Sequence, residues 1–180
     1  FIILLNFNYF TILLALGSMP LAFTYPLMKR YTYWPQLFLG ITFNYGLILG
    51  WTSIENSINL IPVILYFGAI FWTLGYDTIY GYQDITDDEI IGVKSTSIRF
   101  KESPKKFLNM SYLIFFLSVI SVGLISKMNI LFFFLSIILF YHLFFLQVKK
   151  FNKHDATNCF KIFKSNNFLG LLIFANLLIN

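Results

Sequence analysis

Six apolar stretches separated by short polar segments dominate this 180-residue chain and leave it few possible folds. They cover residues 1–23, 37–54, 60–75, 110–126, 129–148 and 168–179. A membrane-spanning helix needs about 20 apolar residues, so the first and fifth stretches are long enough, and the second, third and fourth are tight but plausible. The sixth is shorter, and we expect a half-helix or a span cut short by the end of the chain. No alternating strand pattern appears, so the chain is predicted to be an all-α multi-pass membrane protein with six transmembrane helices.

The distribution of charge supports this count of spans. Charged residues make up only 12% of the chain, against about 25% in a typical soluble domain. All but one of the 13 Lys and Arg fall in residues 24–36, 76–109 and 149–167, which six spans place on one side of the membrane. Lys127 is the exception. The positive-inside rule assigns that side to the cytoplasm or its equivalent. The net charge of +5 is therefore explained by attraction of these basic residues to anionic lipid head groups, and it does not indicate a nucleic-acid partner.

The start of the chain predicts that something precedes it. Phe1 is not a Met and stands inside an apolar run with no signal-peptide pattern. No repeat or linker divides residues 1–180. We therefore expect a single transmembrane domain that is incomplete at its N-terminus.

Most of the chain's eight acidic residues gather in residues 76–100, YDTIYGYQDITDDEIIGVKSTSIRF. Asp77, Asp84 and Asp88 would share one face if the third span continued as a helix beyond the membrane surface. Such close carboxylates repel one another, and a Mg²⁺ ion between them would relieve the repulsion while accepting oxygen ligands. A solvated acidic loop is the alternative, because short acidic patterns are common. The position of Asp77 at the membrane edge favours a functional site.

Basic residues follow these acids at once. Lys94 supplies a point charge and Arg99 a bidentate fork, which together suit a phosphate group. The hydroxyls of Ser95 and Thr96 could donate to phosphate oxygens, and Gly92 permits a tight backbone. The alternative is that these bases only anchor the loop at the membrane surface.

A second loop on the same side carries Tyr25 and Lys29, which one helical turn would bring together. They could form a polar pair beside a site. They could equally belong to an interfacial belt of aromatic and snorkelling basic side chains. The residues alone leave both interpretations open.

Two stretches resemble a known family. Residues 25–46, YPLMKRYTYWPQLFLGITFNYG, and residues 76–100 closely resemble the 4-hydroxybenzoate polyprenyltransferases of the UbiA superfamily of intramembrane aromatic prenyltransferases. The resemblance implies a bundle of nine transmembrane helices around a central cavity, with the six spans here corresponding to the last six. It also implies two aspartate-rich motifs that bind Mg²⁺ and the diphosphate of a polyprenyl donor.

The resemblance assigns roles to single residues. Asp84 and Asp88 match the metal-binding acids of the second motif, and Asp77 matches the acid just upstream. Tyr25 and Lys29 match a polar pair near the reacting centre. With Asp77, these two are the candidates for catalytic residues.

Two basic residues match the family's diphosphate-binding positions, namely Lys94 and Arg99. The family's first motif, NDxxDxxxD, is absent. Half of the Mg²⁺ ligands would then be missing. We expect this chain alone to be inactive or poorly active, unless a separate chain supplies the first three helices.

The implied function is Mg²⁺-dependent transfer of a polyprenyl group from polyprenyl diphosphate to the ring of 4-hydroxybenzoate in ubiquinone biosynthesis. The expected location is the bacterial or mitochondrial inner membrane, with the motif loops on the cytoplasmic or matrix side. Alternatives are another acceptor (a naphthoate, homogentisate or haem), an inactive membrane remnant, and an unrelated channel or transporter.

Overall fold

The apolar stretches form helices, and the prediction of an all-α fold is confirmed. The computed structural model describes residues 4–179, and no strand occurs within that range. Its first half contains η1 (Leu4–Asn6), α1 (Tyr9–Thr24), η2 (Tyr25–Leu27), α2 (Met28–Tyr31), α3 (Pro35–Phe43), α4 (Tyr45–Glu55) and α5 (Leu60–Gly81). Its second half contains α6 (Ile85–Ile91), α7 (Thr96–Arg99), α8 (Pro104–Ile125), α9 (Ile130–Tyr141), the π-helix η3 (His142–Lys149) and α10 (Ala156–Leu178).

Five of the predicted spans correspond to long apolar helical segments. Among the described residues these segments are Tyr9–Tyr31, Pro35–Glu55, Leu60–Gly81, Pro104–Ile125 and Ile130–Lys149. The first three residues of the predicted first stretch lie outside the described part of the chain.

The sixth predicted span is not among these segments of the described residues, and the half-helix offered as one alternative for it is wrong. α10 has 23 residues and begins at Ala156, inside the segment expected to be a loop. Its first turns are polar, and Asp155 caps them by accepting a hydrogen bond from the Asn158 N–H at 3.0 Å. The apolar stretch therefore marks only the second half of this helix.

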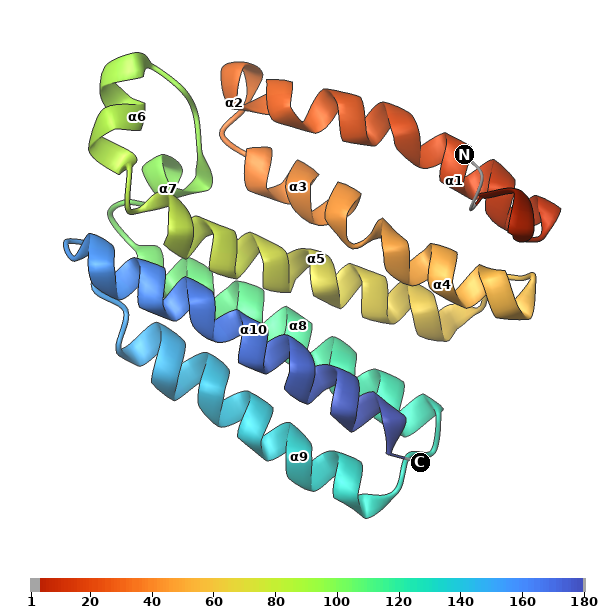
Figure 1. Cartoon of the computed structure of the whole chain (residues 1–180). Helices are drawn as coiled ribbons and strands as arrows, with labels where there is room; N and C mark the ends of the chain where they lie inside the picture. The colour runs from red at the N-terminus through yellow and green to blue at the C-terminus, as the bar shows by residue number, and fades with distance from the viewer. Residues whose placement is uncertain (1–3, 180) are drawn as a thin grey trace.

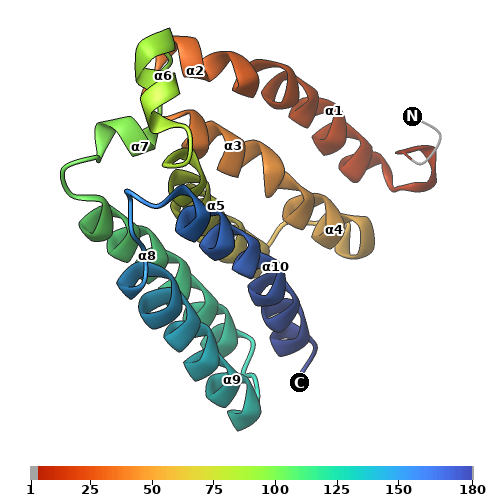
Figure 2. The same ribbon diagram turned by 60° about the vertical axis from the view of Figure 1, so that its left-hand side comes forward.

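The helices are arranged in successive layers (Figures 1 and 2). α1 and α2 lie outermost, α3 and α4 come next, and α5 lies between them and the group formed by α8, α9 and α10. The main apolar core is in that last group, where Phe115, Leu143 and Leu169 are buried. The Trp72 ring of α5 stacks on Phe115 at a centroid distance of 5.4 Å.

α5 and α8 approach closely through glycines on α5. A Cβ placed at Gly68 would lie 2.5 Å from the Cβ of Ser118, and a Cβ at Gly75 would overlap the ring of Tyr112. Inside a bilayer the hydrophobic effect does not drive helices together. Close backbone packing of this kind is therefore a main source of helix–helix stability in membranes.

A buried hydrogen-bond network connects the helices of the core. The Tyr112 hydroxyl donates to Gln147 Oε1 at 2.5 Å, and Gln147 Nε2 donates to Asn166 Oδ1 at 2.9 Å. Trp72 Nε1 donates to the same Asn166 oxygen at 2.9 Å. Gln147 Nε2 also lies 3.2 Å from Nδ1 of His142. The network links α5, α8, η3 and α10 while satisfying polar groups that would be costly to bury alone.

The second span is broken between α3 and α4 at Asn44. The Asn44 amide nitrogen lies 2.8 Å from the Gly40 carbonyl oxygen, 3.2 Å from the Ala69 carbonyl oxygen and 2.8 Å from Thr73 Oγ1. Two of these three acceptors belong to α5. The side chain therefore fixes the break to α5 and compensates for lost helical hydrogen bonds.

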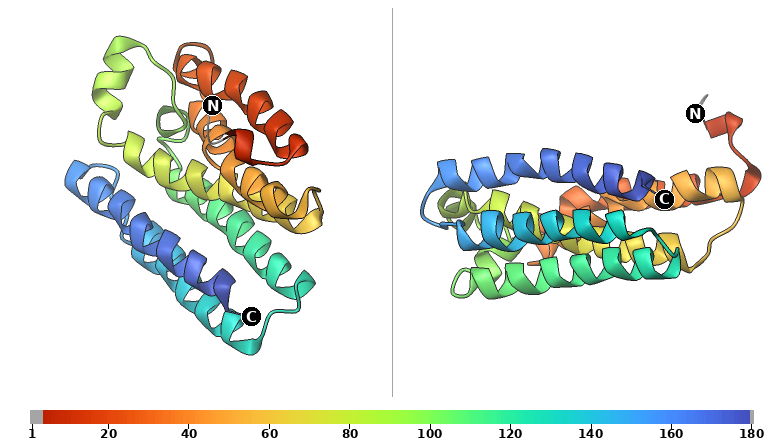
Figure 3. Two further views of the ribbon diagram at one scale, coloured as in Figure 1. Left: turned by 45° about the vertical axis from the view of Figure 1, so that its right-hand side comes forward. Right: turned by 90° about the horizontal axis from the view of Figure 1, so that it is seen from below.

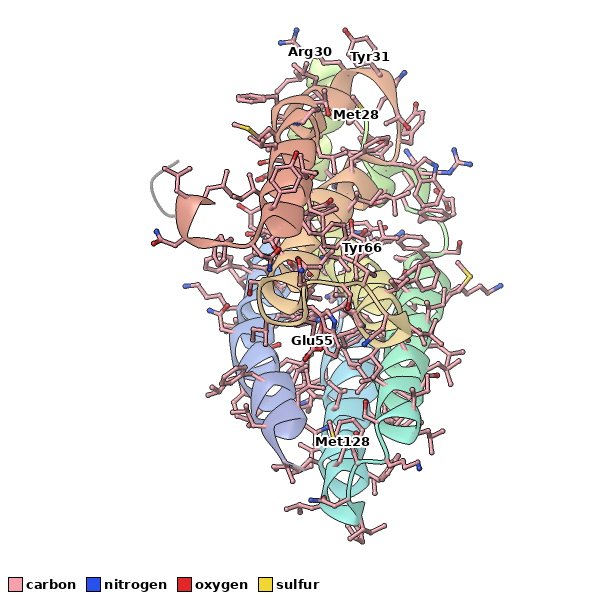
Figure 4. The ribbon with its side chains drawn as sticks, turned by 90° about the vertical axis from the view of Figure 1, so that its right-hand side faces the viewer. Met28, Arg30, Tyr31, Glu55, Tyr66 and Met128 are labelled. Carbon is pink, nitrogen blue, oxygen red and sulfur yellow. The ribbon has the colours of Figure 1, made fainter. Side chains whose placement is uncertain are left out.

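The two ends of the bundle differ in character. The segments around α2, α6, α7 and the η3–α10 connection gather at one end (Figures 1 and 3). Glu55 and Met128 belong to the opposite end, which faces the viewer in Figure 4. The long loops thus lie together, as predicted, and the candidate site is found among them.

Candidate active site

The carboxylates do not lie on one continuous helix, which corrects the expected acidic stripe. α5 ends at Gly81 because its last carbonyls find other partners. The Ser97 hydroxyl donates to the Thr78 carbonyl at 2.8 Å, and the Tyr82 N–H pairs with the Ile79 carbonyl at 3.2 Å. The chain then turns and starts α6 as a separate helix.

The short helix α6 positions two of the acids. Asp84 occupies its N-cap and Asp88 lies in its first turn, where helix dipoles favour negative charge. The helix ends at Gly92, whose φ of +81° is left-handed. The N–H groups of Gly92 and Val93 both donate to the Asp88 carbonyl, which closes the helix.

The helix break nevertheless gathers the predicted residues into one surface pocket of about 450 Å³, which we call the carboxylate pocket. Its lining residues come from η2, α2, α3, α5 and α6: Tyr25, Pro26, Lys29, Gln36, Leu39, Asp77, Tyr80, Gly81, Asp84 and Asp88. A smaller cavity of about 50 Å³ shares Tyr25, Lys29 and Asp77. Five of the seven predicted site residues are therefore together.

The oxygen atoms in this pocket suit a hard divalent cation. Within residues 4–179, no hydrogen bond or ion pair involves the side-chain carboxylates of Asp77, Asp84 or Asp88. In the same range, no group of three Asp, Glu, His or Cys side chains is close enough to form a metal site unaided. Mg²⁺ often binds through one or two carboxylates together with waters and substrate phosphates, so Asp84 and Asp88 fit this ion.

The electrostatics of Asp88 reflect its crowded position. Partial burial raises the pKa of its carboxyl above the ordinary value, and the charges of Asp84 and Asp87 raise it further. The Lys29 ammonium opposes them and lowers the pKa. A cation bound between the acids would act in the same direction as Lys29.

The two predicted diphosphate-binding bases lie outside the carboxylate pocket. Lys94 Nζ donates to the Tyr31 carbonyl at 3.2 Å and lies 5.6 Å from the centroid of the Tyr33 ring. It lines a separate cavity of about 340 Å³. The Arg99 guanidinium lies over the Trp34 ring at 5.5 Å. The structure does not bring these two bases to the acids.

The identity of this arrangement is decided by comparison with known proteins. A sequence model of the UbiA prenyltransferase family matches residues 1–175. This chain belongs to the UbiA prenyltransferase family. The predicted resemblance is thereby confirmed.

Several relatives in the UbiA family carry the same description. The chain is 39% identical over 178 residues to the mitochondrial 4-hydroxybenzoate polyprenyltransferase of Rattus norvegicus, covering 98% of this chain and 47% of the relative. For Homo sapiens the identity is 41% over 179 residues, covering 98% and 48%. The chain thus spans about half the length of these curated relatives. No solved structure matches it.

Among the residues of this UbiA-family pocket that sequence reasoning missed, Gln36 is the one with a buried polar side chain. Gln36 is buried at the start of α3, where its Oε1 accepts a hydrogen bond from the Thr96 N–H at 3.0 Å. It lines both the carboxylate pocket and the smaller cavity. In the sequence, the feature that could have identified Gln36 was its polar amide side chain at the start of an apolar stretch.

The hydroxyls near Lys94 act differently from the expectation. Ser95, Thr96 and Ser97 are buried. Thr96 Oγ1 lies 2.6 Å from Thr78 Oγ1, and the Lys94 N–H donates to the Lys29 carbonyl at 2.8 Å. These contacts hold α7 against α5 and connect the Lys94 segment to α2, so the hydroxyls stabilise the walls of the site.

Not every polar residue of this end faces the pocket. Arg30 follows Lys29 directly, yet Arg30 and Tyr31 extend from the outer edge of the bundle (Figure 4). Neither lines the carboxylate pocket. Lys29 is therefore the base of α2 that belongs to the site.

Proposed function

We propose that this chain provides the second aspartate-rich site of a UbiA-family enzyme that transfers a polyprenyl group from its diphosphate to the ring of 4-hydroxybenzoate. The observation that carries the proposal is the carboxylate pocket, where three acids meet Tyr25 and Lys29. Relatives described as 4-hydroxybenzoate polyprenyltransferases support this choice of acceptor. The reaction would serve ubiquinone biosynthesis.

In this proposal Asp84 and Asp88 hold Mg²⁺, with Asp77 nearby. The bound ion would supply neutralisation of the charge on the leaving diphosphate. Lys29 adds a second positive charge in the same pocket. Fixed charges of this kind, aimed at a developing anion, are commonly the largest catalytic contribution.

The acceptor would lie against Tyr25, Lys29 and Asp77, which line both the large and the small cavity. The allylic C–O bond of the donor breaks, the ring carbon bonds to the allylic carbon, and the ring then loses a proton. Orienting the ring toward the allylic carbon is the task of this side of the pocket.

Lys94 and Arg99 are proposed to hold the diphosphate once it binds. The Lys94 ammonium has a neutral carbonyl as its partner, and charge-assisted hydrogen bonds to phosphate oxygens are stronger. Exchange of the Tyr31 carbonyl for a phosphate oxygen would move Lys94 toward the acids.

For the membrane, we propose that α10 is the sixth span and that the six spans correspond to the last six helices of a nine-helix bundle. The missing first motif would then come from a segment beyond this chain or from a separate chain. We place the pocket on the matrix or cytoplasmic side of an inner membrane, because nearly all bases lie at that end.

The test is prenyl transfer by membranes from cells that make the protein at full length. Asp84→Asn and Asp88→Asn are expected to lower the rate by on the order of 100-fold or more, as loss of a main electrostatic stabiliser does. Asp87→Asn is the matched control, because Asp87 lies in the same helix without lining the pocket.

The readout is labelled polyprenyl diphosphate incorporated into 4-hydroxybenzoate, with a naphthoate and homogentisate as competing acceptors. A normal rate in Asp84→Asn would contradict the metal assignment. Preference for another acceptor would contradict the substrate assignment alone.

A further inference from the structure

A second pocket lies at the same end of the bundle and shares no lining residue with the carboxylate pocket. It has a volume of about 730 Å³ and forms where the start of α8 meets the connection between η3 and α10. Five lysines line it, with Glu102 as the one acid of its lining: Lys105, Lys106, Lys149, Lys150 and Lys153. We call it the basic pocket.

The two walls of the basic pocket are joined by hydrogen bonds between segments far apart in the chain. Lys105 Nζ donates to the Lys149 carbonyl at 3.2 Å, and Lys153 Nζ donates to the Lys101 carbonyl at 2.8 Å. Both acceptors are neutral, so they position the ammonium groups without cancelling their charge. Within the described residues, the ammonium groups of Lys106 and Lys150 make no hydrogen bond or ion pair.

The basic pocket lies at the level where membrane-spanning segments end. The segment Pro104–Ile125 begins there, and Ile130–Lys149 ends there. The Lys149 ammonium lies 5.8 Å from the centroid of the exposed Phe145 ring, one turn deeper in the same segment. An apolar surface therefore continues from the pocket toward the membrane interior.

Orientation of the chain in the membrane does not by itself require such a pocket. Lysines that serve only the positive-inside rule can be spread over their loops, as each acts through its charge alone. Here five lysines from two segments of the chain line one concavity, with Glu102 as the single acidic residue of its lining. Ammonium groups that are close together repel one another unless an anion lies between them.

We propose that the basic pocket binds the head group of an anionic membrane lipid that carries two phosphates. Basic pockets between transmembrane helices on this side of a membrane suit such head groups. A single phosphodiester would leave most of the positive charge uncompensated. The lipid's acyl chains would lie along the apolar surface that begins at Phe145. The site is independent of the prenyl-transfer chemistry proposed above.

The test is a lipid titration of the purified protein in neutral detergent, followed by native mass spectrometry. The lipids are diphosphatidylglycerol, phosphatidylglycerol and phosphatidylcholine. The pocket variant is Lys106→Gln with Lys150→Gln, because no described hydrogen bond depends on those ammonium groups. The matched control is Lys161→Gln with Lys164→Gln, which removes the same charge from α10 at the same end.

We expect diphosphatidylglycerol to bind with a dissociation constant at least about tenfold below that of phosphatidylglycerol, and phosphatidylcholine not to compete. The pocket variant should weaken diphosphatidylglycerol binding by about tenfold or more, and the control by less than about twofold. Unchanged thermal unfolding midpoints would confirm that both variants fold.

Two results would overturn the proposal. Equal weakening in both variants would mean that the lysines attract lipid only as diffuse charge. Complete displacement of the lipid by equimolar inorganic diphosphate would mean that the pocket selects a soluble phosphate compound and not a lipid.

Discussion

The ionisation of Asp88 depends on charged residues in and beside the carboxylate pocket. Burial raises the pKa of its carboxyl, Lys29 lowers it, and Asp84 and Asp87 raise it. A protonated carboxyl cannot ligate Mg²⁺. With a raised pKa, protonation begins to compete with the metal at a higher pH than for an ordinary aspartate, so the Mg²⁺ requirement should rise on mild acidification.

Replacing Lys29 by Gln should move this effect to higher pH, because the charge that lowers the pKa of Asp88 is lost. The measurement is the Mg²⁺ concentration that gives half-maximal prenyl transfer across a pH series. Arg30→Gln is the control, since Arg30 is adjacent but outside the carboxylate pocket. Equal shifts in both variants would contradict a specific effect of Lys29.

Gln36 is the second residue whose role can be isolated. Gln36→Leu leaves the Thr96 N–H without its acceptor inside the fold, which typically costs about 1–3 kcal/mol. We expect a lower thermal unfolding midpoint and slower prenyl transfer. Gln83→Leu is the control, because the Gln83 amide donates only to the nearby Tyr80 carbonyl at an exposed position. An unchanged midpoint in Gln36→Leu would refute this role.

Single residues were predicted with mixed success. Spacing indicated that Asp77, Asp84 and Asp88 belong together, and they share a pocket. The sequence could not place Lys94 or Arg99, because the Tyr31 carbonyl and the Trp34 ring that hold them are remote in the chain. Gln36 was missed because its partner lies 60 residues away.

At the level of elements, the contact between α5 and α8 depends on the absence of side chains. Gly75→Ala should destabilise the fold by about 1–3 kcal/mol, because the added methyl group overlaps the buried Tyr112 ring. Gly50→Ala is the matched control in α4, where a Cβ would have no described atom within 4 Å. Thermal unfolding in detergent measures both. Equal midpoints for the two variants would contradict this account of the interface.

Hydropathy predicts the positions of helices wherever burial in the bilayer is the main requirement on the sequence. Five of the six predicted spans are found among the described residues, because each is a long apolar run. α10 was underestimated, since its first turns are polar, and Asp155 and Asn166 use polar contacts to support them. The end of α5 was also not predictable from local sequence. The Ser97 hydroxyl that donates a hydrogen bond to the Thr78 carbonyl belongs to α7, which comes after α6 in the chain.

At the scale of the whole molecule, the network around Gln147 connects the core helices. Gln147→Leu leaves the Tyr112 hydroxyl without an acceptor and removes a donor to Asn166. We expect the free energy of unfolding to fall by about 1–3 kcal/mol. Adding Tyr112→Phe should cost much less in this background than alone, because the two side chains share one hydrogen bond. Strictly additive effects in a double-mutant cycle would contradict the coupling.

The break at Asn44 has a mechanical consequence for the whole molecule. Membranes differ in hydrophobic thickness, and a span adapts to a mismatch mainly by tilting. The Asn44 amide attaches the second span to α5 near its midpoint, so a tilt of α4 about this point would leave α3 in register with α5. Gln36 and the wall of the carboxylate pocket lie on the α3 side. The site would therefore keep its shape in bilayers of different thickness.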